Sequence, residues 1–477
     1  MSPRRGSTPA ARSAEDVLPD GEPTSIVRRA PFADSPFVGE RGQRAQNKIL
    51  EAALEVFGEV GYHGCGIKRI TEVSGYSRAS FYQYFSSKED LFRHLAGRVA
   101  RLLNESADAL EPITGDQAGW NSLHDWLTRY SAIYDDYEAV FVTFQTAVVS
   151  DEMVASGANV VLNRISTDLR SAIVGSPLTP AQVDNVVRTI LQTVARLNRE
   201  AELIELAAPS SSLDRARANL AYADVLHRAL FGVKPSVNVH TSTKRVKPLP
   251  LPASALADPD DDGDPSHGPA AQQTRAHLLE AGHRVFIERG YYATRVADIV
   301  KAAGVSHGVF YRYFENKTDL FRILAERASN HLAEALDTFP DLFGPATKKR
   351  ARDLRDWLGR YADSYAAESS IFTMWSEAIS RDREITEVSV ALIDRSRARL
   401  ARELAARGWG DAEADGLVLL VLLDAMVSQR GVTSTRVEAV AQLVERGLLT
   451  GPKATKRPAG AAKPARRPAK AASARSR

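Results

Sequence analysis

The sequence predicts an all-α protein built from two tandem copies of one module, and three observations lead to this prediction. A stretch of 49 residues, 44–92, recurs without a gap as residues 273–321. Apolar residues in both stretches recur with the period of an α-helix. No segment alternates apolar and polar residues for long enough to predict a strand. Each module is expected to hold a three-helix helix-turn-helix domain followed by a longer helical domain.

The repeat fixes the expected domain organisation, because internal repetition reports how often one structural unit occurs. Phe57 corresponds to Phe286, and the likeness continues more weakly downstream, where Trp126 corresponds to Trp357. We expect seven segments: a disordered N-terminal segment 1–40, a helix-turn-helix domain 41–92, a helical domain 93–232, a Pro/Asp-rich linker 233–270, a second helix-turn-helix domain 271–321, a second helical domain 322–451, and a basic disordered tail 452–477.

The first helix of each copy is amphipathic. Ile49, Ala53 and Val56 lie on one face at the i, i+4, i+7 spacing, and Leu278 and Val285 repeat this pattern in copy two. No similar pattern appears in the linker or the tail. The linker is rich in proline and aspartate and the tail carries nine Lys/Arg and no acid, so neither is expected to bury enough apolar surface to fold. A flexible linker of nearly 40 residues would reach roughly 35 Å.

Two short helical segments follow the first helix in each copy, separated by Gly75 or Gly304. Two helices joined by a tight glycine-containing turn form a helix-turn-helix, whose second helix enters the major groove of DNA. The glycines permit the positive φ that such a turn uses, and Ser77 and Ser306 are suited to cap the second helix. The alternative is a helical hairpin that binds no DNA.

Each copy resembles the N-terminal domain of the tetracycline-repressor (TetR) family of bacterial transcriptional regulators. The resemblance rests most on Phe81-Tyr82-x-Tyr84-Phe85-x-x-Lys88, which recurs as Phe310-Tyr311-x-Tyr313-Phe314-x-x-Lys317. It implies a sequence-specific DNA-binding regulator, and we expect a repressor whose affinity for a double-stranded DNA operator is lowered by a small hydrophobic effector. The alternative is an architectural DNA-binding protein that uses the modules and the basic tail without ligand control.

The resemblance also assigns DNA contacts to matching positions. In copy one they are Lys68, Ser77, Arg78, Ala79, Ser80, Tyr82, Tyr84 and Lys88, and in copy two Arg295, Ser306, His307, Gly308, Val309, Tyr311, Tyr313 and Lys317. Arginine reads guanine with two hydrogen bonds, whereas valine contacts only a thymine methyl group. Because Arg78 and Val309 belong to different copies, the copies are expected to prefer different half-sites.

A further set of aromatic residues follows each motif. They are Trp126, Tyr130, Tyr134, Phe141 and Phe144 in copy one, and Trp357, Tyr361, Tyr365, Phe372 and Trp375 in copy two. The resemblance implies a ligand pocket between helices, which is usually apolar with a few polar groups. The alternative for any one of these residues is ordinary helix packing.

Other function classes find little support in the sequence. Residues 304–308 match Gly-x-Ser-x-Gly, but a nucleophile elbow needs a preceding strand, and here both flanks are helical. His63 and Cys65 are a weak metal pair, and one cysteine allows no intrachain disulfide. We therefore expect no enzyme, no metal and no cofactor. We also expect a cytoplasmic protein without a membrane partner, because no apolar run approaches the ~20 residues of a membrane span.

The last expectation concerns assembly. Family members with one module pair through C-terminal helices, and this chain carries two modules. A tether gives the two copies a high local concentration, so we expect an intrachain pseudo-dimer. The alternative is a dimer of chains with four recognition helices.

Overall fold

The structure is a computed structural model of the 477-residue chain. It describes residues 39–147, 152–207, 212–234, 237–238, 240–250, 268–343, 347–379, 383–427 and 432–451. The predicted N-terminal segment up to residue 38 and the tail from residue 452 lie outside these residues, as do residues 251–267, which contain the Asp-rich part of the linker.

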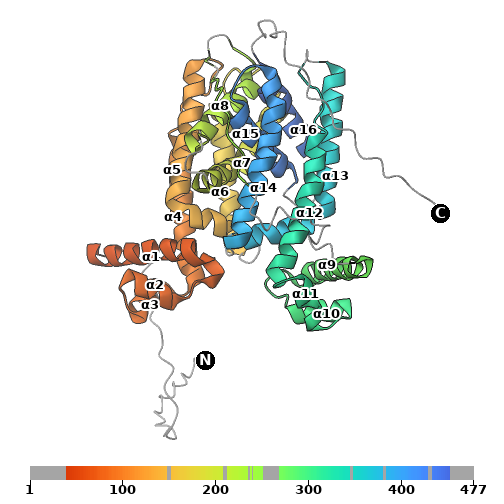
Figure 1. Cartoon of the computed structure of the whole chain (residues 1–477). Helices are drawn as coiled ribbons and strands as arrows, with labels where there is room; N and C mark the ends of the chain where they lie inside the picture. The colour runs from red at the N-terminus through yellow and green to blue at the C-terminus, as the bar shows by residue number, and fades with distance from the viewer. Residues whose placement is uncertain are drawn as a thin grey trace, which may run out of the picture.

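Copy one comprises eight helices among its described residues. They are α1 (Glu40–Gly64), α2 (Ile67–Ser74), α3 (Arg78–Tyr84), α4 (Lys88–Asp108), α5 (Gln117–Ala147), α6 (Glu152–Ala172), α7 (Pro180–Ala207) and α8 (Arg215–Phe231). Helices α1–α3 form the first helix-turn-helix unit, and α4 leads from it into the bundle of α5–α8 (Figure 1).

Copy two repeats this order. Its helices are α9 (Pro269–Arg289), α10 (Val296–Ala303), α11 (His307–Tyr313), α12 (Lys317–Asp337), α13 (Lys348–Ile379), α14 (Arg383–Leu404), the short η3 (Ala405–Arg407), α15 (Ala412–Val427), α16 (Ser434–Leu443) and η4 (Val444–Leu448), which is one π-helical turn. The described residues contain no strand, only isolated bridges, so the predicted all-α fold is confirmed. No helix in the described part is long and apolar enough to cross a bilayer.

Both helix-turn-helix units are built by the local signals in the sequence. Gly75 and Gly304 have φ of 73° and 66°, which ends α2 and α10 in the left-handed conformation that glycine adopts without steric cost. The Ser77 side chain then accepts a hydrogen bond from the backbone N–H of Ser80 at 3.0 Å, which caps the start of α3. Ser306 caps α11 in the same way.

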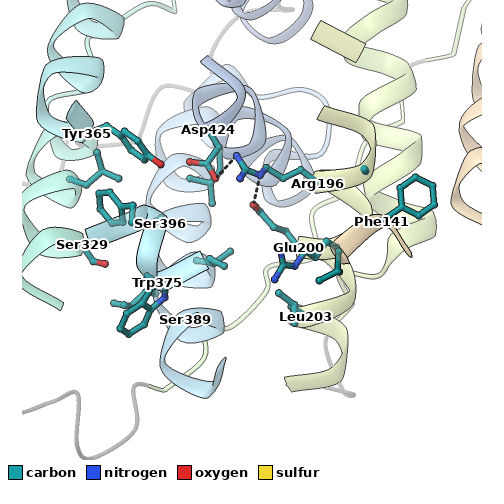
Figure 2. A pocket seen from close by; sticks show the side chains of 18 of the residues that line it. Phe141, Arg196, Glu200, Leu203, Ser329, Tyr365, Trp375, Ser389, Ser396 and Asp424 are labelled. Atoms are coloured by element: carbon teal, nitrogen blue, oxygen red, sulfur yellow. Dashed lines mark ion pairs between the residues drawn. The ribbon is translucent and has the colours of Figure 1, made fainter. Parts of the chain in front are cut away.

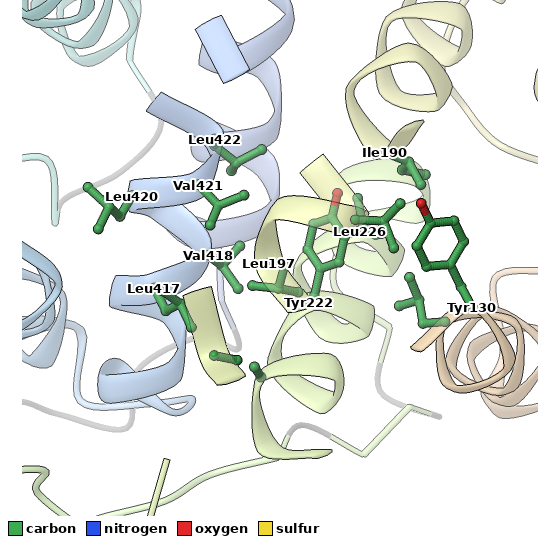
Figure 3. Packing of buried hydrophobic residues seen from close by; sticks show 14 of the residues in the cluster. Tyr130, Ile190, Leu197, Tyr222, Leu226, Leu417, Val418, Leu420, Val421 and Leu422 are labelled. Atoms are coloured by element: carbon green, nitrogen blue, oxygen red, sulfur yellow. The ribbon is translucent and has the colours of Figure 1, made fainter. Parts of the chain in front are cut away.

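The two copies share one hydrophobic core. Helices α7 and α8 of copy one contact α15, α16 and η4 of copy two, and Figure 1 shows these helices side by side in the centre of the molecule. In Figure 3, Leu417 and Val421 of α15 face Leu197 of α7 and Tyr222 of α8. These side chains are almost fully buried, which removes from water the apolar stripe of α15.

Polar contacts join the same helices. The Arg217 guanidinium on α8 donates two hydrogen bonds to the Asp411 carboxylate, at 2.5 and 2.7 Å, in a pair that is largely buried. Arg228 Nε donates to the carbonyl of Gly447 at 2.8 Å, and Arg446 Nε donates to the carbonyl of Ala229 at 2.7 Å. The two copies are therefore held at a fixed angle by directional bonds as well as by apolar packing.

Residues 240–250 of the predicted linker have fixed contacts, contrary to the expectation of a wholly flexible linker. The His240 N–H donates to Asp224 of copy one at 3.0 Å, and the Leu249 N–H donates to Asp394 of copy two at 2.7 Å. Arg217 also donates to the carbonyl of Lys244 at 3.3 Å. The composition of this segment did not predict these contacts, because buried carboxylates on the two copies supply the hydrogen-bond partners of its backbone.

Candidate nucleic-acid interface and effector cavity

The two helix-turn-helix units lie at the same end of the molecule (Figure 1). In each unit one aromatic residue anchors the second helix: Phe81 in α3 and Phe310 in α11 are fully buried. The first residues of each short helix, Arg78 and Ala79 in α3 and His307 and Gly308 in α11, are exposed. One chain thus presents two recognition helices on one face, which is the arrangement that a two-half-site operator requires.

The structure leaves most predicted DNA contacts accessible. The exposed ones are Lys68, Ser77, Arg78, Ala79, Arg295, Ser306, His307, Gly308 and Tyr311. Those that are half-buried are Ser80, Tyr82, Tyr84, Lys88, Val309, Tyr313 and Lys317. At one position of the aromatic motif the two copies differ in solvent exposure: Tyr311 is 57% exposed, whereas the corresponding Tyr82 is half-buried.

Two further residues of this face were not singled out from the sequence. Gln83 and Arg312 occupy corresponding positions in α3 and α11, and both are exposed. Each lies one helical turn after a predicted contact, Ala79 or Gly308, so the i, i+4 spacing would have identified them. Arginine and glutamine prefer different bases, which adds a further position at which the two copies differ.

Lys88 and Lys317 have contacts within the protein that the sequence did not predict. The Lys88 ammonium donates to the carbonyls of Tyr62 and Cys65 at 2.8 and 3.0 Å. The Lys317 ammonium donates to the carbonyls of Tyr291 and Thr294 at 2.8 and 2.9 Å. Each lysine thus satisfies carbonyl groups at the end of the first helix of its unit. Phosphate binding by these lysines remains a prediction.

A cavity of about 190 Å³ lies between the two copies (Figure 2). Its wall includes six of the aromatic residues that the sequence assigned to a ligand pocket: Tyr134, Phe141, Tyr361, Tyr365, Phe372 and Trp375. The first two come from α5 of copy one, and the other four come from α13 of copy two. The predicted residues therefore meet around one cavity that both copies line.

The other predicted pocket residues do not line this cavity. Trp126 and Trp357 are buried in the core, where Trp357 Nε1 donates to the carbonyl of Ala335 at 3.0 Å. Tyr130 is also buried and contacts the ring of Trp126. These three residues therefore take part in ordinary helix packing, which was the alternative interpretation. The Phe144 side chain lies outside the described residues.

Charged residues that the sequence analysis did not single out line one side of the cavity. Arg196 of α7 lies between two carboxylates: its Nε is 3.9 Å from Glu200 Oε1, and its Nη1 is 3.6 Å from Asp424 Oδ2 (Figure 2). Burial and the nearby Asp424 raise the pKa of Glu200 to about 8. Burial likewise raises the pKa of Asp424. No local spacing relates residues on α7 and α15, so sequence reasoning had no signal for this cluster.

The cavity wall is in contact with the second helix-turn-helix unit. The ring of Trp375 lies 5.7 Å from the ring of Phe321, centroid to centroid. Phe321 in turn packs against Phe286 and Tyr291, at 5.0 and 4.8 Å, inside the core of that unit. A change in the position of Trp375 would therefore reach α9 and the segment that follows it directly.

Comparison with known proteins agrees with the geometry of the two units. Residues 49–95 and 278–324 each match the sequence profile described as "Bacterial regulatory proteins, tetR family". The matched segments run from within α1 into α4 and from within α9 into α12. They thus contain both helix-turn-helix units and the recurring aromatic motif.

The chain also matches curated relatives over part of its length. The "Probable HTH-type transcriptional regulator ArpR" of Pseudomonas putida is 40% identical over 75 residues, which are 15% of this chain and 36% of ArpR. The regulator TtgR of Pseudomonas putida is 41% identical over 71 residues, 14% of this chain and 34% of TtgR. The repressor AcnR of Corynebacterium glutamicum is 26% identical over 140 residues, 28% of this chain and 74% of AcnR. The chain spans about a third of the length of the first two relatives.

Proposed function

The chain belongs to the tetR family of bacterial regulatory proteins and carries two tandem modules of that family, and on this premise we propose that it is a sequence-specific DNA-binding transcriptional regulator. The observation that carries the proposal is the pair of accessible recognition helices, α3 and α11, at one end of a single chain. The proposed base and phosphate contacts are the sixteen positions named from the resemblance, together with Gln83 and Arg312.

We further propose that one chain acts as an intrachain pseudo-dimer. The shared core of α7, α8, α15 and α16 supports this, because the apolar surface that one module would offer to a second chain is already buried within the chain. The recognition helices of the pseudo-dimer are not identical, so its operator would have two different half-sites rather than a palindrome.

We propose that the protein is a repressor and that a small effector in the shared cavity lowers its DNA affinity. Trp375 supports this route, since it lines the cavity and contacts Phe321 of the second unit. An effector that changed the distance between the recognition helices would move them away from the ~34–36 Å that separates half-sites on one face of DNA. The size of the response would depend on how much more tightly the effector binds the state with low DNA affinity than the state with high DNA affinity.

Selection from a pool of random duplexes, with the full chain at near-physiological salt, tests the DNA-binding proposal. We expect enrichment of one asymmetric site bound by one chain, with sedimentation at the 52.1 kDa mass of a single chain. Uniform recovery of sequences would instead favour the architectural alternative, which the nine cations of the tail support. Two chains per site, at twice that mass, would refute the pseudo-dimer.

Arg78 provides a test at one residue. It is exposed at the start of α3, and Arg78→Ala is expected to reduce discrimination at one position of one half-site by about 1–3 kcal/mol. Arg78→Lys is the matched variant, because it keeps the charge and loses the planar two-bond geometry. Unchanged base discrimination in Arg78→Ala, with an affinity that falls equally on all sequences, would show that Arg78 contacts phosphate and that the assignment is wrong.

A further inference from the structure

Residues 240–250, which we call the clasp, are held against the body of the protein at their middle. Val246 is only 9% exposed and belongs to the hydrophobic core that the two copies share. The Ser242 N–H donates to the carbonyl of Gly410 at 3.4 Å, in the turn that leads into α15 of copy two. An apolar anchor and a backbone hydrogen bond therefore dock this part of the linker, although its composition is that of a tether.

Each end of the clasp supplies a donor to a buried carboxylate. At the start, the His240 N–H donates to Asp224 at 3.0 Å, and the His240 ring stacks on Trp120 with the centroids 4.9 Å apart. Near the end, the Leu249 N–H donates to Asp394 at 2.7 Å. Asp224 lies on α8 of copy one and Asp394 on α14 of copy two, and both are buried. A buried carboxylate that loses a donor costs free energy, so the clasp is bound specifically to both copies.

One arginine joins the clasp to the two copies. The Arg217 guanidinium at the start of α8 donates to both oxygens of Asp411, at 2.5 and 2.7 Å. It also donates to the carbonyl and Oγ of Ser212, at 2.9 and 3.0 Å. Its remaining bonds go to the clasp, to Ser242 Oγ and the Lys244 carbonyl, both at 3.3 Å. The side chain is only 13% exposed, and its planar fork of five N–H donors suits it to connect several segments at fixed directions.

This contact lies far along α8 from the other bonds between the copies. Arg228 and Ala229, near the C-terminal end of α8, bond to residues of the η4 region. At 1.5 Å per residue, about 16 Å along the helix axis separate Arg217 from Arg228. Two sets of bonds at this separation oppose a rotation of the copies that either set alone would allow. Such a rotation would displace α3 and α11, which lie beyond the bundle at one end of the molecule (Figure 1).

We propose that Arg217 is a positioning residue for DNA recognition: through the clasp it holds the two copies at one angle, and so holds α3 and α11 at one separation and orientation. The inference rests on the proposed function, since it states how the pseudo-dimer is matched to an operator of one spacing. Apolar packing is not directional, whereas the hydrogen bonds of a guanidinium are. The clasp is therefore a part of the interface between the copies and not only a tether.

A distance measurement without DNA tests the clasp. Glu72 in α2 and Lys301 in α10 are exposed at corresponding positions of the two copies. Spin labels on Glu72→Cys and Lys301→Cys, in a chain with Cys65→Thr, report the separation of the two helix-turn-helix units by double electron–electron resonance. We expect one narrow distance when the clasp is intact, because the copies are held at one angle.

Two matched variants of this labelled chain isolate the role of Arg217. Arg217→Met keeps an unbranched stem and removes the guanidinium, and should broaden the distance distribution. Arg164→Met is the control, because Arg164 donates to both oxygens of Asp108, at 2.7 and 2.9 Å, within copy one. It should leave the distribution narrow. An equally narrow distance in Arg217→Met, with unchanged helix content, would overturn the proposal.

Hydrogen exchange of the wild type provides a test that needs no variant to fold. The His240 and Leu249 amides donate to buried carboxylates, so they should exchange about tenfold or more slower than in an unstructured peptide. Exchange of both amides at the rate of an unstructured peptide would overturn the proposal, because the clasp would then not be docked in solution.

Operator spacing connects the clasp with recognition. Two additional base pairs between the half-sites turn one of them by about 70° around the duplex axis. The wild type should bind this altered site about a hundredfold more weakly, since both units can no longer engage together. Arg217→Met should lose most of this discrimination, and equal discrimination in both proteins would refute the positioning role. If selection enriches no operator, the proposed function fails, while the distance and exchange measurements still judge the clasp.

Discussion

Lys317 shows how one residue of the aromatic motif serves the fold of the unit that reads DNA. Its ammonium group lies 4.6 Å from the centre of the Tyr291 ring and donates to two carbonyls of the loop between α9 and α10. Partial burial lowers the pKa of Lys317, whereas hydrogen bonds to carbonyl oxygens favour its charged form. The residue therefore ties α12 to the end of the first helix, which fixes where the recognition helix starts.

We expect Lys317→Ala to destabilise the second unit by about 1–3 kcal/mol, because it leaves two carbonyl groups without their donor. Urea unfolding followed by hydrogen exchange in α9 and α10 measures this. Lys301→Ala, at an exposed position of α10, is the control and should leave the stability unchanged. An equal loss in both variants would show that the carbonyl contacts contribute nothing specific.

The raised pKa of Glu200 predicts that the stability of the fold depends on pH. Its pKa is about 8 in the folded chain against an ordinary value of 4.5, so between these values the folded state holds a proton that the unfolded state has released. The stability from this proton is present at low pH and falls as pH rises toward 8, with a slope of at most about 1.4 kcal/mol per unit. Urea midpoints from pH 5 to 8 should therefore decline more for the wild type than for Glu200→Gln. Parallel curves would contradict the raised pKa.

At the scale of elements, the turn of each helix-turn-helix depends on one backbone conformation. Gly304 has a φ of 66°, and a Cβ atom built there would have nothing within 4 Å. Any cost of a side chain at this position is therefore conformational strain and not a clash. Gly308 is also a glycine of this unit, but it lies inside α11, where a Cβ meets only Ser306 Oγ at an ordinary 3.8 Å.

This pair of glycines makes a matched prediction. Gly304→Ala should destabilise the second unit by about 1–2 kcal/mol, because an L-residue is strained in the left-handed region. Gly308→Ala should leave stability unchanged or raise it by up to about 1 kcal/mol, since alanine is the better helix former. Copy one already has Ala79 at the corresponding position. Thermal unfolding of both variants measures these changes in stability. A larger loss in Gly308→Ala than in Gly304→Ala would refute the role of the turn.

At the scale of the whole molecule, the two copies approach each other closely at Gly447. A Cβ at this position would lie 2.4 Å from the carbonyl oxygen of Val225 in α8. Backbone meets backbone here, and the Arg228 bond to the Gly447 carbonyl lies at the same point. This contact is one of those that set the angle between the copies, and with it the placement of α3 relative to α11.

Gly447→Ala is expected to separate α8 from η4, with a cost of about 1–3 kcal/mol from overpacking. Hydrogen exchange should quicken in both elements, and affinity for the selected operator should fall. Gly359→Ala in α13 is the control, because its Cβ would have nothing within 4 Å. Unchanged exchange and affinity in Gly447→Ala would show that the copies are not positioned by this contact.

The sequence by itself determined the features that depend on local interactions. Helical periodicity, the turn glycines and the capping serines act over a few residues, so the repeat revealed two units of the same fold and the aromatic motif revealed their family. Nine of the sixteen predicted DNA contacts are exposed in the structure, whereas Gln83 and Arg312, which are also exposed, were not singled out from the sequence.

Only the tertiary structure decided what depends on contacts between distant segments. It placed Lys317 against the loop carbonyls, gave residues 240–250 partners on both copies, and brought Arg196 and Glu200 to Asp424. Such contacts follow from the angle at which two helical bundles pack, and many side chains fix that angle together. The corresponding residues Tyr130 and Tyr361 therefore differ in their surroundings: Tyr130 lies in the core, whereas Tyr361 lines the cavity, because the cavity takes most of its aromatic wall from copy two.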